Sequence, residues 1–241
     1  MTDYILSDET KTRLKRTGTA SIATQLYKRG LRNQFIQGVV PVSPKAERMV
    51  GQAFTLRYIP AREDRNPIEV FRNADHPQRV AVETCPPGHV LVMDARRDGS
   101  AATAGSILVT RMAIRGCAGI VSDGGFRDAD GIGALDMPAF YAGPAAPTNL
   151  TKHEALDLNV PIGCGGVAVF PGDVIVGDHD GVMVIPAHLA DEIAEVCTGM
   201  EAFEDFVLEE VLSGTPIIGL YPCTLEENQQ KFDAWLKKTG R

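Results

Sequence analysis

The chain has 241 residues, of which 44% are hydrophobic and 23% are charged, and its formal net charge is -7. This length and composition allow a large buried core, and the negative charge excludes the electrostatic footprint that is typical of nucleic-acid-binding proteins. No apolar run is long enough to span a membrane, and the start, MTDYILSDETKTRLKRTG, lacks the basic-then-apolar order of a secretory signal. We therefore expect a globular, cytoplasmic protein that does not bind nucleic acid directly.

The cysteines indicate thiols rather than a disulfide framework. They are odd in number and far apart, and most stand in apolar surroundings such as RGCAGIV. No CxxC or HExxH pair is present, so a strong zinc signal is absent. The five cysteines are Cys85, Cys117, Cys164, Cys197 and Cys223.

The first third of the chain predicts helix, then strand, then a polar segment. Residues 1–31 have helical patterning that ends at Gly30, with two basic residues in the last turn. Residues 49–61 alternate apolar and polar side chains, as a strand does. Residues 61–83 mix charges and predict an insertion or loop that leads into a short helix and can reshape a nearby pocket.

Residues 90–123 predict a strand, a helix and a second strand. HVLVMDA is typical of a buried strand, the helix begins near Gly105 and ends at Gly116, and CAGIVSD is the next strand. This order favours parallel pairing with a right-handed crossover.

The last third predicts antiparallel strands followed by helices. Residues 160–186 alternate Val and Ile with turn residues, as a β-meander does. DHDG, residues 178–181, has the composition of a hairpin turn in which Asp180 and Gly181 take positive φ. Helices are expected over residues 187–214 and around Trp235, so residues 187–241 form a helical extension of a single domain, residues 1–241.

The stretch VSDGGFRDADG, residues 121–131, follows a predicted strand at the sheet edge where α/β proteins bind ligands. Gly124 and Gly125 would allow a close approach of the backbone to a ligand, or a positive φ. Arg127 matches a carboxylate and Asp128 suits a hard divalent cation, and in an extended segment the two side chains would point to opposite sides. The alternative is an ion pair beside a surface turn.

The predicted helix start TAGSILVT provides a second element of a site. Four backbone amides at such a start form an anion site that the helix dipole reinforces. The alternative is an ordinary cap in which Ser106 or Thr103 satisfies these amides. Beside GGFRD, this start would complete a pocket with an anion hole, an arginine and a carboxylate. The amides are those of Gly105, Ser106, Ile107 and Leu108.

Three other groups allow a functional or a structural interpretation. DHD, residues 178–180, resembles a metal cluster, but neighbouring residues of a tight turn point in different directions. A lone His153 is a base or a structural histidine. Glu201 and Glu204 lie one helical turn apart, which suits either a neighbouring active site or a solvated acidic face.

The segments AGSILVTRMAIRGCAGIVSDGGFRD and GGVAVFPGDVIVGDHDGVMVIP resemble the RraA-like family. That family includes 4-hydroxy-4-methyl-2-oxoglutarate aldolases, oxaloacetate decarboxylases and regulators of ribonuclease E. The resemblance implies an α/β fold, an αββα sandwich similar to the swivelling phosphohistidine domain. It also implies homotrimers or homohexamers with active sites at subunit interfaces.

The resemblance assigns roles to particular residues. Arg127 would bind the pyruvate-type carboxylate, Asp128 would ligate Mg²⁺ or Mn²⁺, and the amides of residues 105–108 would contact the substrate. Glu201 or Glu204 would reach a neighbouring subunit's site, and Asp123 would have a supporting or structural role. One departure is Ser106, because aldolases of the family often carry an acidic residue there.

These observations predict a metal-dependent lyase that acts on a 2-oxo acid, by aldol cleavage of a 4-hydroxy-2-oxo acid or by decarboxylation of oxaloacetate. Two alternatives remain. One is a non-catalytic regulator that binds an RNA-degrading enzyme through protein contacts. The other is an aldolase or dehydratase that uses the same site for a keto-deoxy sugar acid.

Overall fold

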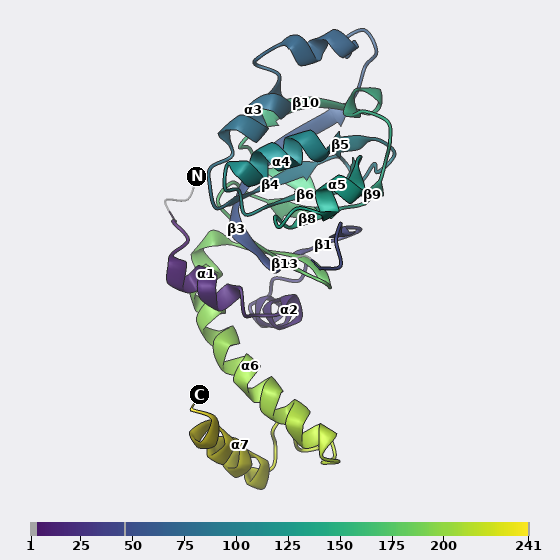
Figure 1. Ribbon diagram of the computed structural model, residues 1–241. Helices are drawn as coiled ribbons and strands as arrows, with labels where there is room; N and C mark the ends of the chain where they lie inside the picture. The colour runs from purple at the N-terminus through teal and green to yellow at the C-terminus, as the bar shows by residue number, and fades with distance from the viewer. Residues whose placement is uncertain (1–3, 46, 241) are drawn as a thin grey trace.

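A computed structural model describes residues 4–45 and 47–240 (Figure 1). The helices are α1 (Asp8–Leu14), α2 (Thr19–Lys28), η1 (Ile68–Arg72), α3 (Pro77–Thr84), α4 (Ser106–Ile114), α5 (Ala129–Gly133), η2 (Asn149–Thr151), η3 (Ala187–Leu189), α6 (Ala190–Leu212) and α7 (Glu226–Thr239). None of the helices in these residues has the length and apolar character needed to cross a membrane.

Most strands join one large mixed sheet, in the order β1-β14-β13-β3-β4-β6-β8-β2, with β10 also paired to β3. A second sheet contains β5, β7 and β9, and a third contains β11 and β12. The strands are β1 (Phe35–Ile36), β2 (Val40–Pro41), β3 (Met49–Pro60), β4 (His89–Asp94), β5 (Ala102–Ala104), β6 (Gly119–Ser122), β7 (Gly125–Phe126), β8 (Ala139–Tyr141), β9 (Gly143–Pro144), β10 (His153–Leu158), β11 (Ile162–Cys164), β12 (Val167–Val169), β13 (Val174–Asp178) and β14 (Gly181–Ile185).

The predicted strand-helix-strand unit is confirmed. β4 and β6 pair in parallel, from Val90 opposite Gly119 to Met93 opposite Ser122, with α4 between them in the chain. β3 and β8 extend this parallel set on either side. Because the carboxyl ends of parallel strands meet at one edge, the loops after β4 and β6 lie together there.

Strand β4 shows why the sheet is buried on both faces. Its side chains alternate, so Leu91 and Met93 pack with the helical layer of α3, α4 and α5, while Val90 and Val92 pack with β11 and β12 on the other face. A strand buried on both faces reads as a continuous apolar run, which is how HVLVMDA appears in the sequence.

A second group of helices, α1, α2 and the first half of α6, packs against β13, β14 and the start of β3. It covers the same face of the large sheet as α3, α4 and α5, because Val50 and Leu56 of β3 point to the same side. The second half of α6 leaves the body of the molecule and packs against α7, so the two form an arm (Figure 1). The predicted helices at residues 187–214 and around Trp235 are therefore confirmed as η3, α6 and α7.

The DHDG segment is a turn with a structural role. Asp178 accepts hydrogen bonds from Thr19 N at 2.8 Å and Thr19 Oγ1 at 2.7 Å, and so caps the start of α2. The helical patterning of the first 31 residues corresponds to α1 and α2, and residues 1–3 lie outside the described residues. The expected positive φ is found at Gly181, where φ is 140°, and not at Asp180.

The observed fold class is mixed α/β, as predicted. The finer comparison with the swivelling phosphohistidine domain stays a prediction. Helices cover one face of the large sheet, and the β11–β12 hairpin packs on the other. The predicted meander is antiparallel as expected, but its strands divide between two sheets. All five cysteines are free thiols.

Candidate active site

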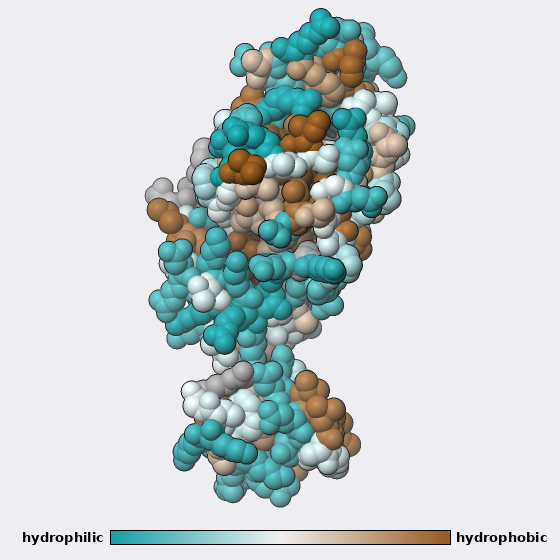
Figure 2. Space-filling view, viewed as in Figure 1, coloured by the Kyte–Doolittle hydropathy of each residue, from teal (hydrophilic) through white to brown (hydrophobic). Residues whose placement is uncertain are grey.

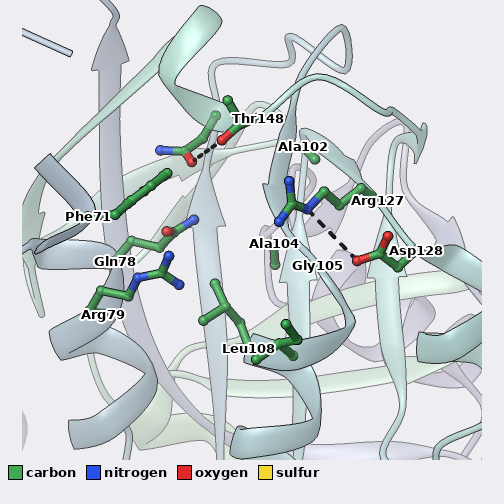
Figure 3. Close-up of a pocket in the computed structure, with 12 residues that line it drawn as sticks. Phe71, Gln78, Arg79, Ala102, Ala104, Gly105, Leu108, Arg127, Asp128 and Thr148 are labelled. Carbon is green, nitrogen blue, oxygen red and sulfur yellow. Dashed lines mark hydrogen bonds and ion pairs between the residues drawn. The ribbon is translucent and has the colours of Figure 1, made fainter. Parts of the chain in front are cut away.

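A pocket of about 130 Å³ lies between α3, the start of α4 and the loop after β7 (Figure 3). It contains Arg127 and Asp128, together with three of the four residues whose amides were predicted to bind an anion. The fourth, Ser106, contacts Asp128 at the edge of the pocket. The lining residues are Phe71, Gln78, Arg79, Ala102, Ala104, Gly105, Ile107, Leu108, Arg127, Asp128, Thr148 and Asn149.

Arg127 and Asp128 face the same pocket, which corrects the expectation that they point to opposite sides. Asp128 has left-handed backbone angles, φ 56° and ψ 42°, and this turn brings its Oδ2 to 3.8 Å from Arg127 Nε (Figure 3). Aspartate tolerates this conformation better than most residues. Both side chains are about half exposed, so both are accessible to a ligand.

Asp128 also caps α4. Its Oδ2 accepts from Ser106 N at 3.3 Å and from Ser106 Oγ at 3.2 Å. Leu108 N bonds back to Gly105 O at 3.1 Å. The expectation of four free amides is therefore wrong for Ser106 and Leu108, whereas the Ile107 amide has no hydrogen bond within the described residues.

Gly124 and Gly125 serve packing, which corrects the expectation that they approach a ligand or take positive φ. Neither glycine has a positive φ. A Cβ on Gly124 would lie 2.6 Å from Ala95 Cβ, and one on Gly125 would lie 2.5 Å from Ala145 Cβ. The two glycines let β7 lie closely against its neighbours and so fix the position of Arg127.

The donor set in the pocket suits a hydrated divalent cation. Asp128 is the single carboxylate that lines it, and in the described residues no group of three or more His, Cys, Asp or Glu side chains is arranged to hold a metal. Mg²⁺ retains several waters and needs only one or two carboxylates, so Asp128 fits this ion. A zinc site with three or four protein ligands does not fit.

The polar segment 61–83 supplies a wall of the pocket that sequence reasoning did not resolve into residues. Phe71 comes from η1, and Gln78 and Arg79 come from α3. Thr148 and Asn149 reach the pocket through the pairing of Ala102 with Thr148. The charge mixture of the segment indicated a pocket loop, but nothing in its local pattern distinguished Arg79.

Asp123 has a structural role. It is 2% exposed, and its carboxylate accepts from three backbone amides, those of Ala95, Arg97 at 3.1 Å and Gly165 at 2.9 Å. Burial raises the pKa of this carboxyl, while the amides oppose the shift. Asp123 thus ties the loop after β4 to the turn after β11, and it does not line the pocket.

Glu201 and Glu204 lie away from the pocket, on α6. Glu204 Oε1 accepts from Tyr221 of the same chain at 3.3 Å, and burial raises the pKa of Glu201. A role in a neighbouring subunit's site stays a prediction. His153 is fully buried beside Arg96, 3.0 Å from Arg96 Nη2, in agreement with the structural interpretation.

Comparison with known proteins places the chain in a family. The family model described as "RraA-like: Aldolase/RraA" matches residues 19–184, which include α4, β7, Arg127 and Asp128. The chain belongs to the RraA-like family. The match ends within β14, so the arm of α6 and α7 lies outside the RraA-like region.

Three relatives illustrate the range of the RraA-like comparison. A Halalkalibacterium halodurans protein named "Putative 4-hydroxy-4-methyl-2-oxoglutarate aldolase" is 39% identical over 127 residues, 53% of this chain and 60% of that protein. Streptomyces coelicolor RraAS2, described as an unusual member of the RNase ES inhibitor RraA protein family, is 29% identical with a TM-score of 0.72, over 83% of this chain and 96% of that one. An uncharacterized Pseudomonas syringae protein is similar in fold, with a TM-score of 0.74 at 24% identity over 90% and 98% of the two chains.

Proposed function

We propose that this RraA-like protein is a divalent-metal-dependent lyase that releases pyruvate from a 2-oxo acid, by cleavage of a 4-hydroxy-2-oxo acid or by decarboxylation of oxaloacetate. The observation that carries the proposal is the meeting of Arg127, Asp128 and the start of α4 in one pocket. The aldolase name of the H. halodurans relative supports the reaction class, although the match spans only 60% of that relative's length.

Arg127 binds the carboxylate that becomes the carboxylate of pyruvate. Its one carboxylate contact within the described residues is Asp128, at 3.8 Å, so its N–H groups remain available. A guanidinium donates two parallel hydrogen bonds to a carboxylate, which fixes the orientation of the bound acid.

In aldol cleavage the 4-hydroxyl gives up its proton as the carbon–carbon bond breaks, and in decarboxylation the broken bond releases CO₂. In both reactions the electron pair of that bond is delocalised onto the enolate oxygen of the pyruvate fragment, and the enolate carbon then takes a proton from water to give pyruvate. The Ile107 amide and the positive end of the α4 dipole stabilise negative charge at this position. Asp128 is the side chain that would hold a divalent cation, which would supply a Lewis acid for the developing negative charge. Ser106 orients the Asp128 carboxylate through two hydrogen bonds.

The test is pyruvate release, followed through lactate dehydrogenase and NADH, with Mg²⁺ or Mn²⁺ and with a chelator. The substrates are oxaloacetate, a 4-hydroxy-2-oxo acid and a keto-deoxy sugar acid. Asp128→Asn keeps a residue that accepts left-handed angles but removes the charge, and it should lower kcat/KM by about 100-fold or more. Asp130→Asn, outside the pocket, is the matched control. No metal-dependent pyruvate from any substrate, or full activity of Asp128→Asn, would overturn the proposal.

A second candidate function is regulation of an RNA-degrading enzyme through protein contacts, and the description of S. coelicolor RraAS2 favours it. The two functions separate in one comparison. If the protein captures an RNA-degrading enzyme and Asp128→Asn captures it equally well, binding does not need the pocket. If the protein captures no RNA-degrading enzyme but does release pyruvate, only the lyase function is supported.

We also propose that the sites lie at subunit interfaces of a homotrimer or homohexamer, with Glu201 or Glu204 acting in a neighbouring copy. The support is the family resemblance, together with the location of both residues outside the pocket of their own chain. Light scattering coupled to size-exclusion chromatography distinguishes a monomer from a trimer or a hexamer.

A further inference from the structure

A second arginine enters the pocket from the wall opposite Arg127. Arg79 projects from α3, and its guanidinium points into the same space as that of Arg127 (Figure 3). The two residues are 48 positions apart in the chain, yet both line the one pocket. Burial, and after it the charge of Arg127, lowers the pKa of Arg79. Two cations therefore face one cavity.

Within the described residues, the guanidinium of Arg79 has no carboxylate partner and no hydrogen bond to the protein. Its guanidinium lies over the ring of Phe71, 4.6 Å from the ring centroid. Neighbouring arginines differ: Arg111 is paired with Glu83 at 2.9 Å and Arg65 with Glu154 at 3.0 Å. Arg79 is thus held by a contact that leaves its donors free.

The position of Arg79 is fixed by the residue before it. Gln78 is 3% exposed, and its Nε2 donates to Thr103 O at 2.6 Å, which ties α3 to β5. The buried side chains Ala81 and Val82 hold the next turn of α3 against the core. An arginine on an anchored helix loses little conformational entropy when it binds an anion.

Positive charge exceeds negative charge in the pocket. Arg79 and Arg127 carry two positive charges, and Asp128, the single acidic side chain among the lining residues, lies beside Arg127, at 3.8 Å. One carboxylate of a ligand on Arg127 would cancel the net charge of these three side chains but would leave Arg79 without an anionic contact, and a divalent cation held by Asp128 would add further positive charge. A ligand with a second anionic group would satisfy both arginines.

We propose that Arg79 is a specificity-determining residue that binds a second carboxylate of the substrate, across the pocket from the carboxylate on Arg127. The α3 wall then selects dianionic over monoanionic 2-oxo acids. This inference rests on the proposed function for the first carboxylate, and it assigns the selection to the polar segment that carries Phe71 and Arg79.

The test compares two five-carbon acids that differ at one end, 2-oxoglutarate and 2-oxopentanoate. Neither has the 4-hydroxyl or the β-carboxylate that cleavage requires, so calorimetry with Mg²⁺ present measures binding alone. The wild-type protein should bind 2-oxoglutarate with an affinity about 10-fold to 100-fold higher than that for 2-oxopentanoate, because hydrogen bonds to a charged group contribute about this much. Arg79→Met should reduce this ratio to about 1 and leave the affinity for 2-oxopentanoate within about twofold.

Three variants make the result specific. Arg79→Lys should restore part of the ratio, because it returns the charge without the planar fork. Arg72→Met, on the exposed end of η1 and outside the pocket, should leave the ratio unchanged. Arg127→Met should weaken both acids. Thermal unfolding by circular dichroism verifies that each variant is folded.

The outcomes separate this inference from the proposed function. An Arg79→Met protein that keeps the wild-type ratio, or that weakens both acids equally, overturns the role of Arg79 even if the protein releases pyruvate. The expected change of ratio without any turnover of the substrate panel supports the role of Arg79 and overturns the lyase. Binding of neither acid to a wild-type protein that releases pyruvate overturns the role of Arg79 and leaves the lyase standing.

Discussion

At the scale of single residues, two glycines near the pocket differ in what a methyl group would displace. A Cβ on Gly105 would lie 2.9 Å from Arg127 Nε and 3.0 Å from Asp128 Oδ2, which are ends of half-exposed side chains. A Cβ on Gly124 would lie 2.6 Å from Ala95 Cβ, in the packed interior. A side chain at position 105 would therefore disturb the pocket, whereas one at position 124 would disturb the packing of the interior.

We predict opposite phenotypes for the two alanine variants. Gly105→Ala should displace Arg127 and Asp128 and lower kcat/KM by about 10-fold to 100-fold, with little change in the melting temperature. Gly124→Ala should lower the free energy of unfolding by about 1–3 kcal/mol, since the interior must shift. Pyruvate release and urea unfolding measure the two effects. A destabilised Gly105→Ala with unchanged activity would contradict this division.

His153 makes stability depend on pH. Burial, together with the charge of Arg96, lowers the pKa of His153, and within the described residues its Nε2 has no hydrogen-bond partner. The unfolded chain therefore takes up a proton first as the pH falls. The contribution of neutral His153 is complete above the unfolded pKa of about 6.5 and is lost as the pH falls through that value toward the lower folded pKa.

We expect the free energy of unfolding to decrease between about pH 7.5 and pH 5, and His153→Gln to reduce this dependence. Glutamine keeps an acceptor for Arg96 but does not titrate. Burial also lowers the pKa of His76, which accounts for a remaining slope. Urea titrations at several pH values measure the effect, and an unchanged slope in His153→Gln would exclude His153 as the source.

At the scale of secondary structure elements, α3 has few polar contacts that hold it beside the pocket. Gln78 donates to Thr103 O at 2.6 Å, and Tyr58 of β3 donates to the same carbonyl at 3.2 Å. The ion pair between Glu83 and Arg111 is exposed on both sides and contributes little. The buried bond of Gln78 is therefore the main polar anchor of α3.

We predict that Gln78→Met lowers the free energy of unfolding by about 1 kcal/mol and also weakens the preference for 2-oxoglutarate, since α3 orients Arg79. Tyr58→Phe is the matched control, because it removes the other bond to Thr103 O and keeps the bond from Gln78. It should cost similar stability and leave the preference intact. Loss of the preference in Tyr58→Phe alone would assign the anchoring to β3.

At the scale of the whole molecule, the arm of α6 and α7 is separate from the three core clusters of the body. Its small core contains Phe206, Val207 and Leu220, with three further aromatic side chains packed around them. Apolar side chains remain exposed at its far end, among them Leu212 at 79% and Ile218 at 87%, and Figure 2 shows an apolar area there. The arm buries little apolar surface, so its local stability is low.

We predict that the arm unfolds before the body. Trp235 is the single tryptophan of the chain and lies on α7, so its fluorescence reports the arm, while circular dichroism at strand wavelengths reports the body. Phe206→Ala should remove about 3–5 kcal/mol from the arm and shift the fluorescence transition to lower temperature, without moving the transition of the body. Coincident transitions in both proteins would contradict independent unfolding.

The sequence by itself determined the elements that local patterns encode. The apolar run 89–95, the helix that ends at Gly116 and the strand over residues 117–123 predicted a parallel unit, and the structure confirms it. Because the carboxyl ends of parallel strands share an edge, the same pattern brought Asp128 to the start of α4. Periodicity and strand order were sufficient for this half of the pocket.

Only the tertiary structure decided the other half. Arg79 and Asn149 reach the pocket through the packing of α3 and the pairing beside β5, contacts between distant segments that no local period encodes. The left-handed turn at Asp128 and the capping of Ser106 likewise depend on two segments that meet in space. Local patterns specify which elements form, whereas side-chain packing between distant elements specifies which charges face one another across a cavity.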